Sequence, residues 1–304
     1  MKPSTLDDYK QRMLKVLVHI QRRMDEELTL AELARVACFS PHHFHHIFSG
    51  MIGESLKEHV RRLRLERAAI QLKLSRKAVI EIALDAGYQT HEAFSRAFKS
   101  AYHLSPLAFR AKKSPIFVLP AASGVHYRER KTLKKFKTSR SGVRNMNVNI
   151  KNFEPMRVAF MRHVGPYKNV GTTWDKFLPL LGKDGFIGGD SQFIGICHDD
   201  PEVTPAEKIR YDACVTVDEK FQPTGDLGVQ TIAGGQYAVT THFGPYEELA
   251  ETYAKLLGQW LPRSGRELRS CACFEVYLND PNSTEPEDLI TDICVPLQPG
   301  PVQR

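Results

Sequence analysis

Residues 33–48 read LARVACFSPHHFHHIF, and residues 82–98 read IALDAGYQTHEAFSRAF. Both stretches hold Leu or Ile followed by Ala, two further residues, Ala and a turn with an aromatic residue, and then Phe-x-x-x-Phe. The pattern returns after 49 residues at its start and after 50 at its end, so a turn absorbs one extra residue. Each copy predicts a short helix, a tight turn and an amphipathic helix, which is a helix-turn-helix unit. Two such units in one chain can read two stretches of DNA without a dimer partner.

The length and apolar content suit two domains, because the chain has 304 residues of which 42% are hydrophobic. Its net charge of +7 hides a division between the two halves. Residues 1–145 carry 28 Lys and Arg against 13 Asp and Glu, whereas residues 146–304 carry 14 against 22. The basic half suits a polyanion such as nucleic acid, and the acidic half does not.

Several classes of protein are disfavoured by the sequence. No run of about 18 apolar residues occurs, and the first residues lead into a charged segment rather than a signal peptide. We therefore expect a cytoplasmic protein. The six cysteines include no C-x-x-C pair, which argues against a zinc ribbon or a dithiol redox motif. We expect reduced thiols, no cofactor and no metal.

Helical periodicity predicts that residues 1–111 form an all-α DNA-binding domain. The periodicity fails after this domain, where residues 112–144 hold ten Lys and Arg against the single acid Glu129. Ser, Gly and Pro are mixed among these charges. Residues 112–145 are therefore predicted to form a flexible basic linker that could also touch phosphate.

From residue 146 onward the chain changes to alternating and β-branched segments, interrupted by two helical stretches. HVGPY at residues 163–167 returns as HFGPY at residues 242–246, a distance of 79 residues. A strand, a Gly-Pro turn, a helix and two strands thus occur twice, and His163 and His242 are expected to buttress the turns. The sequence predicts a multidomain protein, in which an all-α double helix-turn-helix domain precedes an α+β domain with pseudo-twofold symmetry over residues 146–304.

The first candidate DNA-reading helix begins after Ser40, a good N-cap, with Pro41 in its first turn. With the phenylalanines of this helix facing the core, the imidazoles on its outer face could contact base edges or phosphates. The candidate DNA contacts here are His42, His45 and His46. Histidines at i and i+4 could instead chelate a metal. No acid or cysteine lies close in the sequence, which favours DNA contact.

The second candidate reading helix begins after Thr90, its expected N-cap. Its outward residues are the candidate DNA contacts His91, Glu92, Ser95, Arg96 and Lys99. Arg96 is the strongest candidate for a guanine contact, and Glu92 could accept from a cytosine amino group.

A connecting helix over residues 55–72 separates the two units. At about 1.5 Å rise per residue it spans about 27 Å, close to the roughly 34 Å between successive major-groove faces. Such a connector would let one monomer meet two adjacent grooves. Its arginines could meet phosphate, solvate the surface or pack within the fold; these are Arg61, Arg62, Arg64 and Arg67.

These units, their spacing and the ending HLSPLAFR at residues 103–110 resemble the DNA-binding domain of the AraC/XylS family of bacterial transcription regulators. Cys38 stands where members commonly carry Gly or Ser. The resemblance implies binding to double-stranded promoter DNA, with RNA polymerase as a further partner.

The doubled HxGPY element, FEVYLNDP at residues 274–281 and TDICVPL at residues 291–297 resemble the GyrI-like effector-binding domain. The resemblance implies a small, often cationic or amphipathic ligand bound between the two repeats, with Glu275 matching the strand glutamate of the family. Alternation places Cys273 and Tyr277 on the face of Glu275, and Phe274 and Val276 on the other face.

Physical chemistry supports the same site, because a half-buried carboxylate among aromatic rings attracts an organic cation. The candidate ligand-binding residues are Glu275, Tyr277, Tyr167, Tyr246 and Trp174.

The leading hypothesis is a ligand-responsive transcription regulator with no catalytic residues. A second is a hydrolase of a reactive small molecule, because some GyrI-like domains resemble such enzymes. No Ser/His/Asp order, metal motif or phosphate loop supports this reading. A third is a protein that sequesters its ligand. Ligand turnover would favour the enzyme, and ligand-dependent promoter output would favour the regulator.

Overall fold

The computed structural model describes residues 4–26, 28–113, 115–129, 133–139, 146–183, 185–199, 201 and 204–299, without the side chain of His42. The chain divides into two compact units, Met1–Ser141 and Gly142–Arg304. Within the described ranges, every helix is too short or too polar to span a bilayer.

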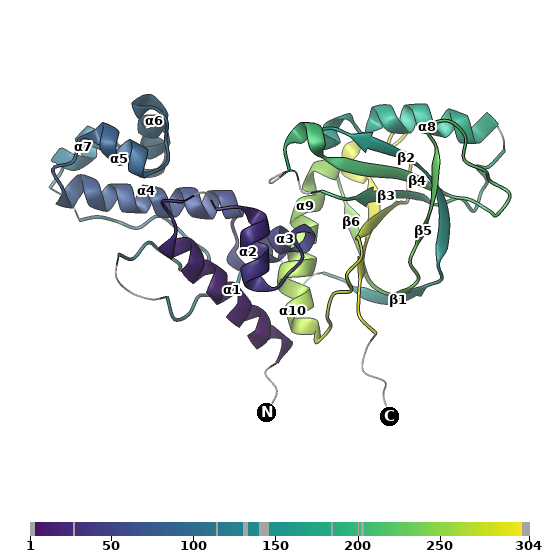
Figure 1. The fold of residues 1–304 in the computed structure, drawn as a ribbon, viewed down its shortest axis with the longest axis horizontal. Helices are drawn as coiled ribbons and strands as arrows, with labels where there is room; N and C mark the ends of the chain where they lie inside the picture. Colours follow the sequence, from purple (N-terminus) through teal and green to yellow (C-terminus); the bar gives the residue numbers. More distant parts are fainter. Residues whose placement is uncertain are drawn as a thin grey trace. The chain divides into compact units, whose positions relative to one another are not determined.

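The first unit is helical, as the periodicity predicted (Figure 1). Its helices are α1 (Thr5–Arg22), α2 (Leu30–Ala37), α3 (Pro41–Ile52), α4 (Leu56–Leu74), α5 (Val79–Asp85), α6 (His91–Tyr102) and α7 (Pro106–Ala111). The helix-turn-helix units are therefore α2–α3 and α5–α6, and the connector is α4. Thr29, Ser55 and Thr90 each accept a backbone N–H at the start of the helix that follows, which satisfies donors that a helix terminus leaves free. Ser40 precedes α3 without a side-chain capping bond.

The repeated Phe-x-x-x-Phe pairs form the centres of the two units. Phe44, Phe48, Phe94 and Phe98 are completely buried, with ring centroids 5.9 Å apart in the first pair and 5.5 Å in the second. Spacing of i and i+4 places both rings of a pair on one side of their helix. The outer faces of α3 and α6 are thereby oriented by the apolar pattern alone.

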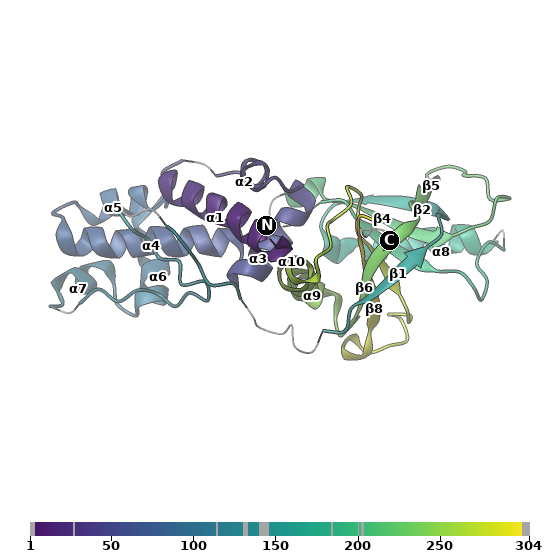
Figure 2. The ribbon, with the colours of Figure 1, turned by 90° about the horizontal axis from the view of Figure 1, so that it is seen from below.

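The segment after α7 differs from the flexible linker that the sequence predicted. Over its described part, Leu119 and Val125 are buried, and the backbone N–H of Tyr127 donates to Glu66 on α4 at 2.8 Å. The N–H of Ser139 donates to the carbonyl of Met51 at the end of α3 at 2.8 Å. Figure 2 shows the segment running beside α4. Isolated apolar residues without periodicity give an extended segment no sequence signature, which is why its packing escaped prediction.

The second unit is an eight-stranded antiparallel sheet in the order β1-β6-β8-β7-β3-β4-β2-β5. The strands are β1 (Asn149–Phe153), β2 (Met156–Val164), β3 (Phe193–Cys197), β4 (Arg210–Thr216), β5 (Gly228–Ile232), β6 (Gly235–Phe243), β7 (Phe274–Tyr277) and β8 (Ile290–Pro296). β5 was not predicted from the sequence. Between strands lie α8 (Gly171–Lys183), α9 (Leu249–Lys255) and α10 (Leu261–Ser264), and a π-helical turn over Leu256–Trp260 joins the last two where one helix was predicted.

The predicted pseudo-twofold symmetry is present throughout the sheet. β5 repeats β1 and β6 repeats β2 after 79 residues, and β8 repeats β4 after 80. The strand order read backwards exchanges each strand with its counterpart, and β1 of the first repeat pairs with β6 of the second just as β5 pairs with β2. The axis therefore lies between the central strands β3 and β7.

The paired histidines occupy equivalent environments, as expected. The Nδ1 atoms of His163 and His242 each lie 2.9 Å from a helix threonine hydroxyl, that of Thr173 or Thr252. Their Nε2 atoms lie 3.2 Å from the carbonyl oxygen of the proline in the adjacent Gly-Pro turn. Each ring thus ties its turn to the following helix.

Candidate ligand site and DNA-reading helices

Glu275 lies on β7 beside the axis and is buried, with 4% of its surface exposed. The Tyr277 hydroxyl donates to its Oε2 at 2.8 Å, and the Tyr253 hydroxyl donates to its Oε1 at 3.2 Å. The Cys197 thiol lies 3.7 Å from the same Oε1. Burial raises the pKa of the carboxyl, against the hydrogen bonds that lower it. Among the described residues, no Lys, Arg or His makes a hydrogen bond or ion pair with it.

Aromatic rings surround this carboxylate. The ring centroid of Tyr277 lies 5.4 Å from that of Tyr246 and 6.0 Å from that of Trp174, and both contacts are edge-to-face. Tyr167 lies 6.2 Å from Tyr211, and its hydroxyl donates to a backbone carbonyl at 2.5 Å. The structure therefore brings together all five residues that the sequence nominated for ligand binding. Their role in binding stays a prediction.

The strand faces follow the predicted alternation. Phe274 is buried in the core on one side of the sheet, and Val276 packs against that core. Tyr277 and Cys197 both contact Glu275 on the other side. Thr252 on α9 bonds His242, and Tyr253 bonds Glu275, so α9 covers the face that carries the carboxylate.

Three residues of the site, Tyr211, Gly195 and Tyr253, are not among those that the sequence nominated. Tyr211 lies on β4, where its hydroxyl accepts from the indole N–H of Trp174 at 3.1 Å and lies 2.9 Å from the Tyr277 hydroxyl. Gly195 lies on β3 directly opposite Glu275. Tyr253 lies on α9, and its hydroxyl reaches the carboxylate. Alternation could place Tyr211 on a face, but the order of the strands that brings it to Glu275 is not written in local sequence.

The opposite face of the sheet holds a second carboxylate, Asp212, whose charge and hydrogen bonds are satisfied by neighbouring side chains. Arg162 donates to both of its oxygens, at 2.7 and 2.9 Å, and His198 and Gln230 contact it at 2.8 and 3.1 Å. Burial raises the pKa of Asp212, but these hydrogen bonds lower it well below its usual value. Asp212 thus has the counter-charge that Glu275 lacks, and its network is structural.

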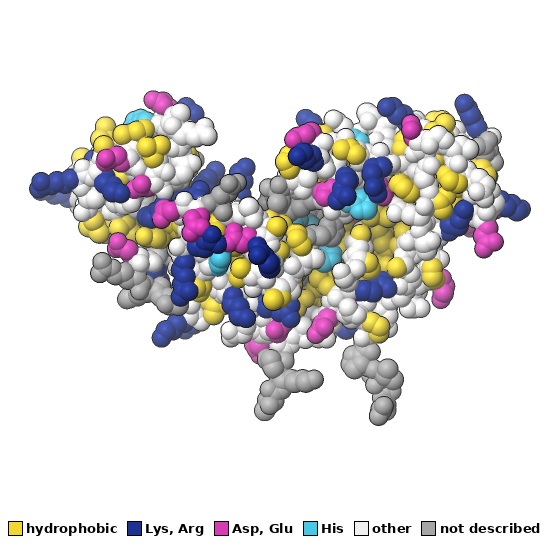
Figure 3. Space-filling model, in the orientation of Figure 1, with side chains coloured by type: hydrophobic (Ala, Val, Ile, Leu, Met, Phe, Trp, Pro, Cys, Tyr) yellow, Lys and Arg dark blue, Asp and Glu magenta, His cyan; other side chains and the backbone are white. Residues whose placement is uncertain are grey.

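On α6 the nominated DNA contacts form one accessible stripe. Glu92, Arg96 and Lys99 are exposed, while His91 and Ser95 are half-buried with His91 Nε2 3.5 Å from the Ser95 hydroxyl. On the face of the helical unit seen in Figure 3, Lys and Arg side chains are interspersed with Asp and Glu rather than gathered in one patch. On this face, the described residues show no basic patch that marks a DNA-binding surface, and the reading role of α3 and α6 stays a prediction.

The nominated histidines of α3 are less exposed than the sequence predicted. His45 is buried at 8% exposed, His46 is half-buried, and their ring centroids lie 3.7 Å apart. The side chain of His42 lies outside the described residues. Among the residues that are described, no group of three or more His, Cys, Asp or Glu is arranged to hold a metal ion. Base contact by this helix stays a prediction.

Most arginines of α4 have structural partners. Arg62 donates to Glu54 at 2.6 and 3.0 Å and to Glu66 at 3.1 Å. Arg64 donates to the carbonyl of Met24 at 2.8 Å, and Arg67 pairs with Asp25 at 2.6 Å. Packing thus accounts for these three side chains, whereas Arg61 is exposed.

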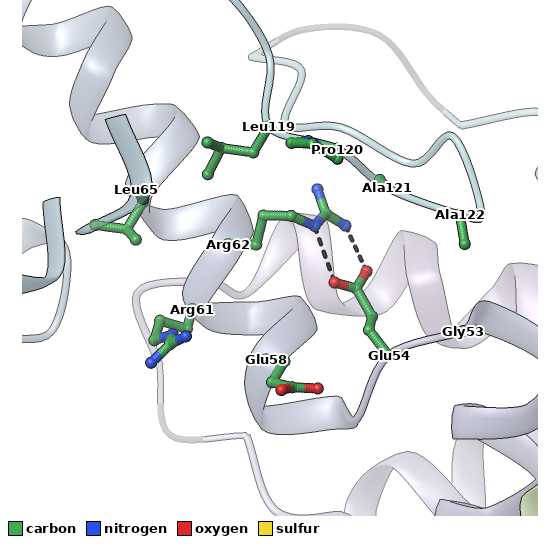
Figure 4. Close-up of a pocket in the computed structure, with 11 residues that line it drawn as sticks. Gly53, Glu54, Glu58, Arg61, Arg62, Leu65, Leu119, Pro120, Ala121 and Ala122 are labelled. Atoms are coloured by element: carbon green, nitrogen blue, oxygen red, sulfur yellow. Dashed lines mark hydrogen bonds and ion pairs between the residues drawn. The ribbon is translucent and has the colours of Figure 1, made fainter. Parts of the chain in front are cut away.

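The Glu54–Arg62 pair borders a cavity of about 400 Å³ in the helical unit (Figure 4). Its wall is formed by the start of α4 and by residues 119–122. Burial raises the pKa of Glu54, but hydrogen bonds from His59 and Arg62 outweigh it and lower the pKa to about 2. Because Glu54 and Arg62 already satisfy each other, the cavity offers no unpaired charge from that pair to a ligand.

Comparison with known proteins relates both halves to described families. Residues 146–298 match the GyrI-like small molecule binding domain, and residues 33–112 match a helix-turn-helix domain. The chain is 31% identical over 155 residues to the probable transcriptional regulator YgiV of Escherichia coli K12, covering 50% of this chain and 96% of YgiV. It is 34% identical over 102 residues to the HTH-type transcriptional regulator YbfP of Bacillus subtilis, covering 34% of this chain and 35% of YbfP. The solved EcmrR–DNA complex is similar over 50% of this chain and 57% of that chain, at 19% identity and a TM-score of 0.42, too low to carry an argument.

Proposed function

The chain belongs to the GyrI-like family of small-molecule-binding proteins and carries an AraC-type helix-turn-helix domain ahead of that fold. On this premise we propose that it is a DNA-binding transcription regulator controlled by a small ligand. Residues 1–111 would read promoter DNA, and residues 146–304 would bind the effector. RNA polymerase would be the partner through which DNA binding alters transcription.

One observation carries the choice of ligand. Glu275 is a buried carboxylate with donors on both oxygens, aromatic rings around it and no basic partner among the described residues. An uncompensated buried charge is costly, so a positively charged ligand gains where a neutral one does not. The rings supply cation-π contact at the same place. The proposed effector is therefore a small organic cation with an apolar body.

The ligand proposal is tested with benzyltrimethylammonium and its uncharged isostere neopentylbenzene. Calorimetric titration of the full chain should show binding of the cation and at least tenfold weaker binding of the isostere. Glu275→Gln should lose this discrimination, whereas Glu247→Gln, an exposed glutamate beside Tyr246, should keep it. Equal affinity for both compounds, or an unchanged preference in Glu275→Gln, would remove Glu275 from the site.

The DNA proposal assigns base contacts to α3 and α6. The contacts would come from His42, His45, His46, His91, Glu92, Ser95, Arg96 and Lys99. Arg96 is exposed in the middle of α6, and a guanidinium can donate to both acceptors of a guanine.

A binding sequence is first selected from random duplexes with the full chain at physiological salt. Arg96→Ala should cost about 1 to 3 kcal/mol at one base pair and relax preference there. Lys134→Ala, an exposed lysine of the segment after α7, should leave base preference intact. Failure to select any sequence would contradict the regulator, and unchanged preference in Arg96→Ala would contradict its base contact.

The hydrolase alternative gains little from the site. The Cys197 thiol lies 3.7 Å from Oε1 of Glu275, and burial raises the pKa of this thiol well above the usual value. A thiol that stays protonated is a poor nucleophile. We infer a binding site without catalysis, and turnover of a bound cation by the full chain would overturn this inference.

A further inference from the structure

The axis that relates the two repeats of the C-terminal unit passes through one residue pair. β3 of the first repeat pairs with β7 of the second, with Phe193 opposite Tyr277 and Gly195 opposite Glu275. Equivalent residues in this part of the repeats are 80 apart, so Gly195 is the counterpart of Glu275. The pseudo-twofold axis passes between them. One repeat therefore contributes a carboxylate at the axis, and the other contributes no side chain.

Position 195 has room only for glycine, because two tyrosine hydroxyls lie directly above it. A Cβ atom there would lie 2.2 Å from the Tyr277 hydroxyl oxygen and 2.6 Å from that of Tyr211. Neither approach is sterically allowed. The two hydroxyls, one from each repeat, are thus able to meet at 2.9 Å over the glycine.

These hydroxyls form a chain whose direction is set at both ends. The Trp174 indole can only donate, and it donates to the Tyr211 hydroxyl at 3.1 Å. The Tyr277 hydroxyl donates its hydrogen bond to Glu275 at 2.8 Å. In the contact between the two hydroxyls, Tyr211 is therefore the donor and the Tyr277 oxygen is the acceptor. Burial raises the pKa of both phenols well above the usual value, so both keep their protons as donors. Hydrogen bonds in series polarise one another, and this chain ends on the carboxylate.

We propose that Gly195 and Tyr211 are positioning residues for the Glu275 carboxylate, which binds the ligand. Gly195 leaves room for the Tyr211 hydroxyl at the axis, and Tyr211 holds the Tyr277 hydroxyl in the orientation that donates to Glu275. The inference rests on the proposed function of Glu275 as the ligand carboxylate. Neither residue contacts Glu275 through a hydrogen bond of its own. Residues of the first repeat thereby orient the hydrogen bond that stabilises Glu275 of the second repeat.

The groups that face Glu275 are phenols and thiols from every element packed against it. They are Tyr277 and Cys273 of β7, Cys197 of β3, Tyr211 of β4, Tyr167 and Tyr246 of the two Gly-Pro turns, and Tyr253 of α9. Burial raises the pKa of each above the usual value. As the pH rises, the first group of this cluster to lose its proton is therefore Glu275 itself.

The test needs no ligand. Infrared spectra of the full chain would follow the protonated carboxyl band of Glu275, assigned by its loss in Glu275→Gln, as the pH is raised. Tyr211→Phe should move the midpoint upward by roughly 0.5 to 1 pH unit, because the carboxylate loses part of its hydrogen-bond support. Tyr237→Phe is the matched control, since its hydroxyl bonds a backbone carbonyl at 2.6 Å and its ring packs in the core on the other face. A midpoint in Tyr211→Phe equal to that of the wild type would overturn the proposal.

Gly195→Ala tests the steric part. Benzyltrimethylammonium affinity should fall at least tenfold, whereas Gly188→Ala should keep it, because a Cβ at 188 meets nothing within 4 Å. Unchanged affinity in a folded Gly195→Ala protein would contradict the role of the glycine. If Tyr211→Phe shows the infrared shift but the wild type binds no cation, the proposed function fails while the positioning chain stands. The two failures are thereby distinguishable.

Discussion

At the scale of single residues, the turns of the two helix-turn-helix units share a left-handed backbone conformation but place different residues in it. Cys38 has a φ of +54° and Gly87 has a φ of +80°, both in the left-handed region. A residue with a Cβ pays for this conformation, and glycine does not. The departure from the AraC/XylS pattern at Cys38 is therefore also a local strain.

Cys38→Gly should raise the free energy of unfolding by about 0.5 to 1 kcal/mol, because the left-handed penalty disappears while glycine adds freedom to the unfolded chain. Urea denaturation followed by circular dichroism measures it. Gly87→Ala should act in the opposite direction, since its Cβ would lie 2.7 Å from the Arg64 guanidinium. A destabilised Cys38→Gly protein would show that the Cys38 side chain contributes more than the strain costs.

Glu275 gives the second prediction at this scale. Burial raises the pKa of its carboxyl in the folded protein above the value in the unfolded chain. The unfolded state thus loses its proton first as the pH rises, so this group makes the fold less stable through that window. Glu275→Gln should therefore melt at a higher temperature than the wild type at pH 7 and approach it at pH 4. Scanning calorimetry at the two pH values decides, and a Gln variant that melts lower at pH 7 would refute the reasoning.

The same titration governs the ligand. Because the carboxylate form attracts the cation, benzyltrimethylammonium affinity should fall as the pH falls through the raised pKa of Glu275. Titration calorimetry at several pH values between 5 and 8 measures the profile. Glu275→Gln provides the flat reference curve, and a flat wild-type curve would contradict a cation bound through this carboxylate.

At the scale of elements, the segment after α7 depends on one buried acid. Glu66 is 3% exposed and accepts from the Tyr127 N–H, contacts His126 at 3.0 Å and pairs with Arg62 at 3.1 Å. It joins the segment to α4, while Leu119 of the segment packs into the core of the second helix-turn-helix unit. The element therefore contacts the connector and both reading units.

Glu66→Ala should lower the free energy of unfolding by about 1 to 3 kcal/mol, because it leaves the Tyr127 N–H and one N–H of the buried Arg62 without their acceptor. Hydrogen exchange should show lost protection at the amides of Tyr127, Lys137 and Ser139, which are bonded at 2.8 Å in the native fold. Glu129→Ala, an exposed acid of the same segment, is the control. Unchanged protection in Glu66→Ala would show that the segment is held by its apolar residues alone.

At the scale of the whole molecule, two units of opposite charge balance suggest two ligands of opposite charge on one chain. If the cation and DNA are coupled, thermodynamic linkage requires each to change the affinity of the other by the same factor, typically about 5-fold to 150-fold. Cation affinity measured with and without the selected duplex, and duplex affinity measured with and without the cation, should agree. Glu275→Gln should remove the coupling and keep DNA binding. A cation affinity that the duplex leaves unaltered would contradict ligand control.

The sequence by itself determined both repeats and the nature of each half. Helices and tight turns close through contacts between residues three or four apart, so the pattern of small residues, caps and paired phenylalanines predicts α2–α3 and α5–α6 directly. The recurrence of HxGPY likewise predicts the pseudo-twofold domain, and alternation predicts the faces of β7. Charge division follows from counting alone.

Only the tertiary structure decided which residues complete each half. Strand pairing brings together residues far apart in the chain, so nothing local to Gly195 or Tyr211 indicates that they meet Glu275 across the axis. The partners of the α4 arginines and the packing of residues 115–129 and 133–139 depend in the same way on distant groups. Local periodicity therefore predicts elements and faces, whereas the partners of a buried charge are settled only when the elements pack.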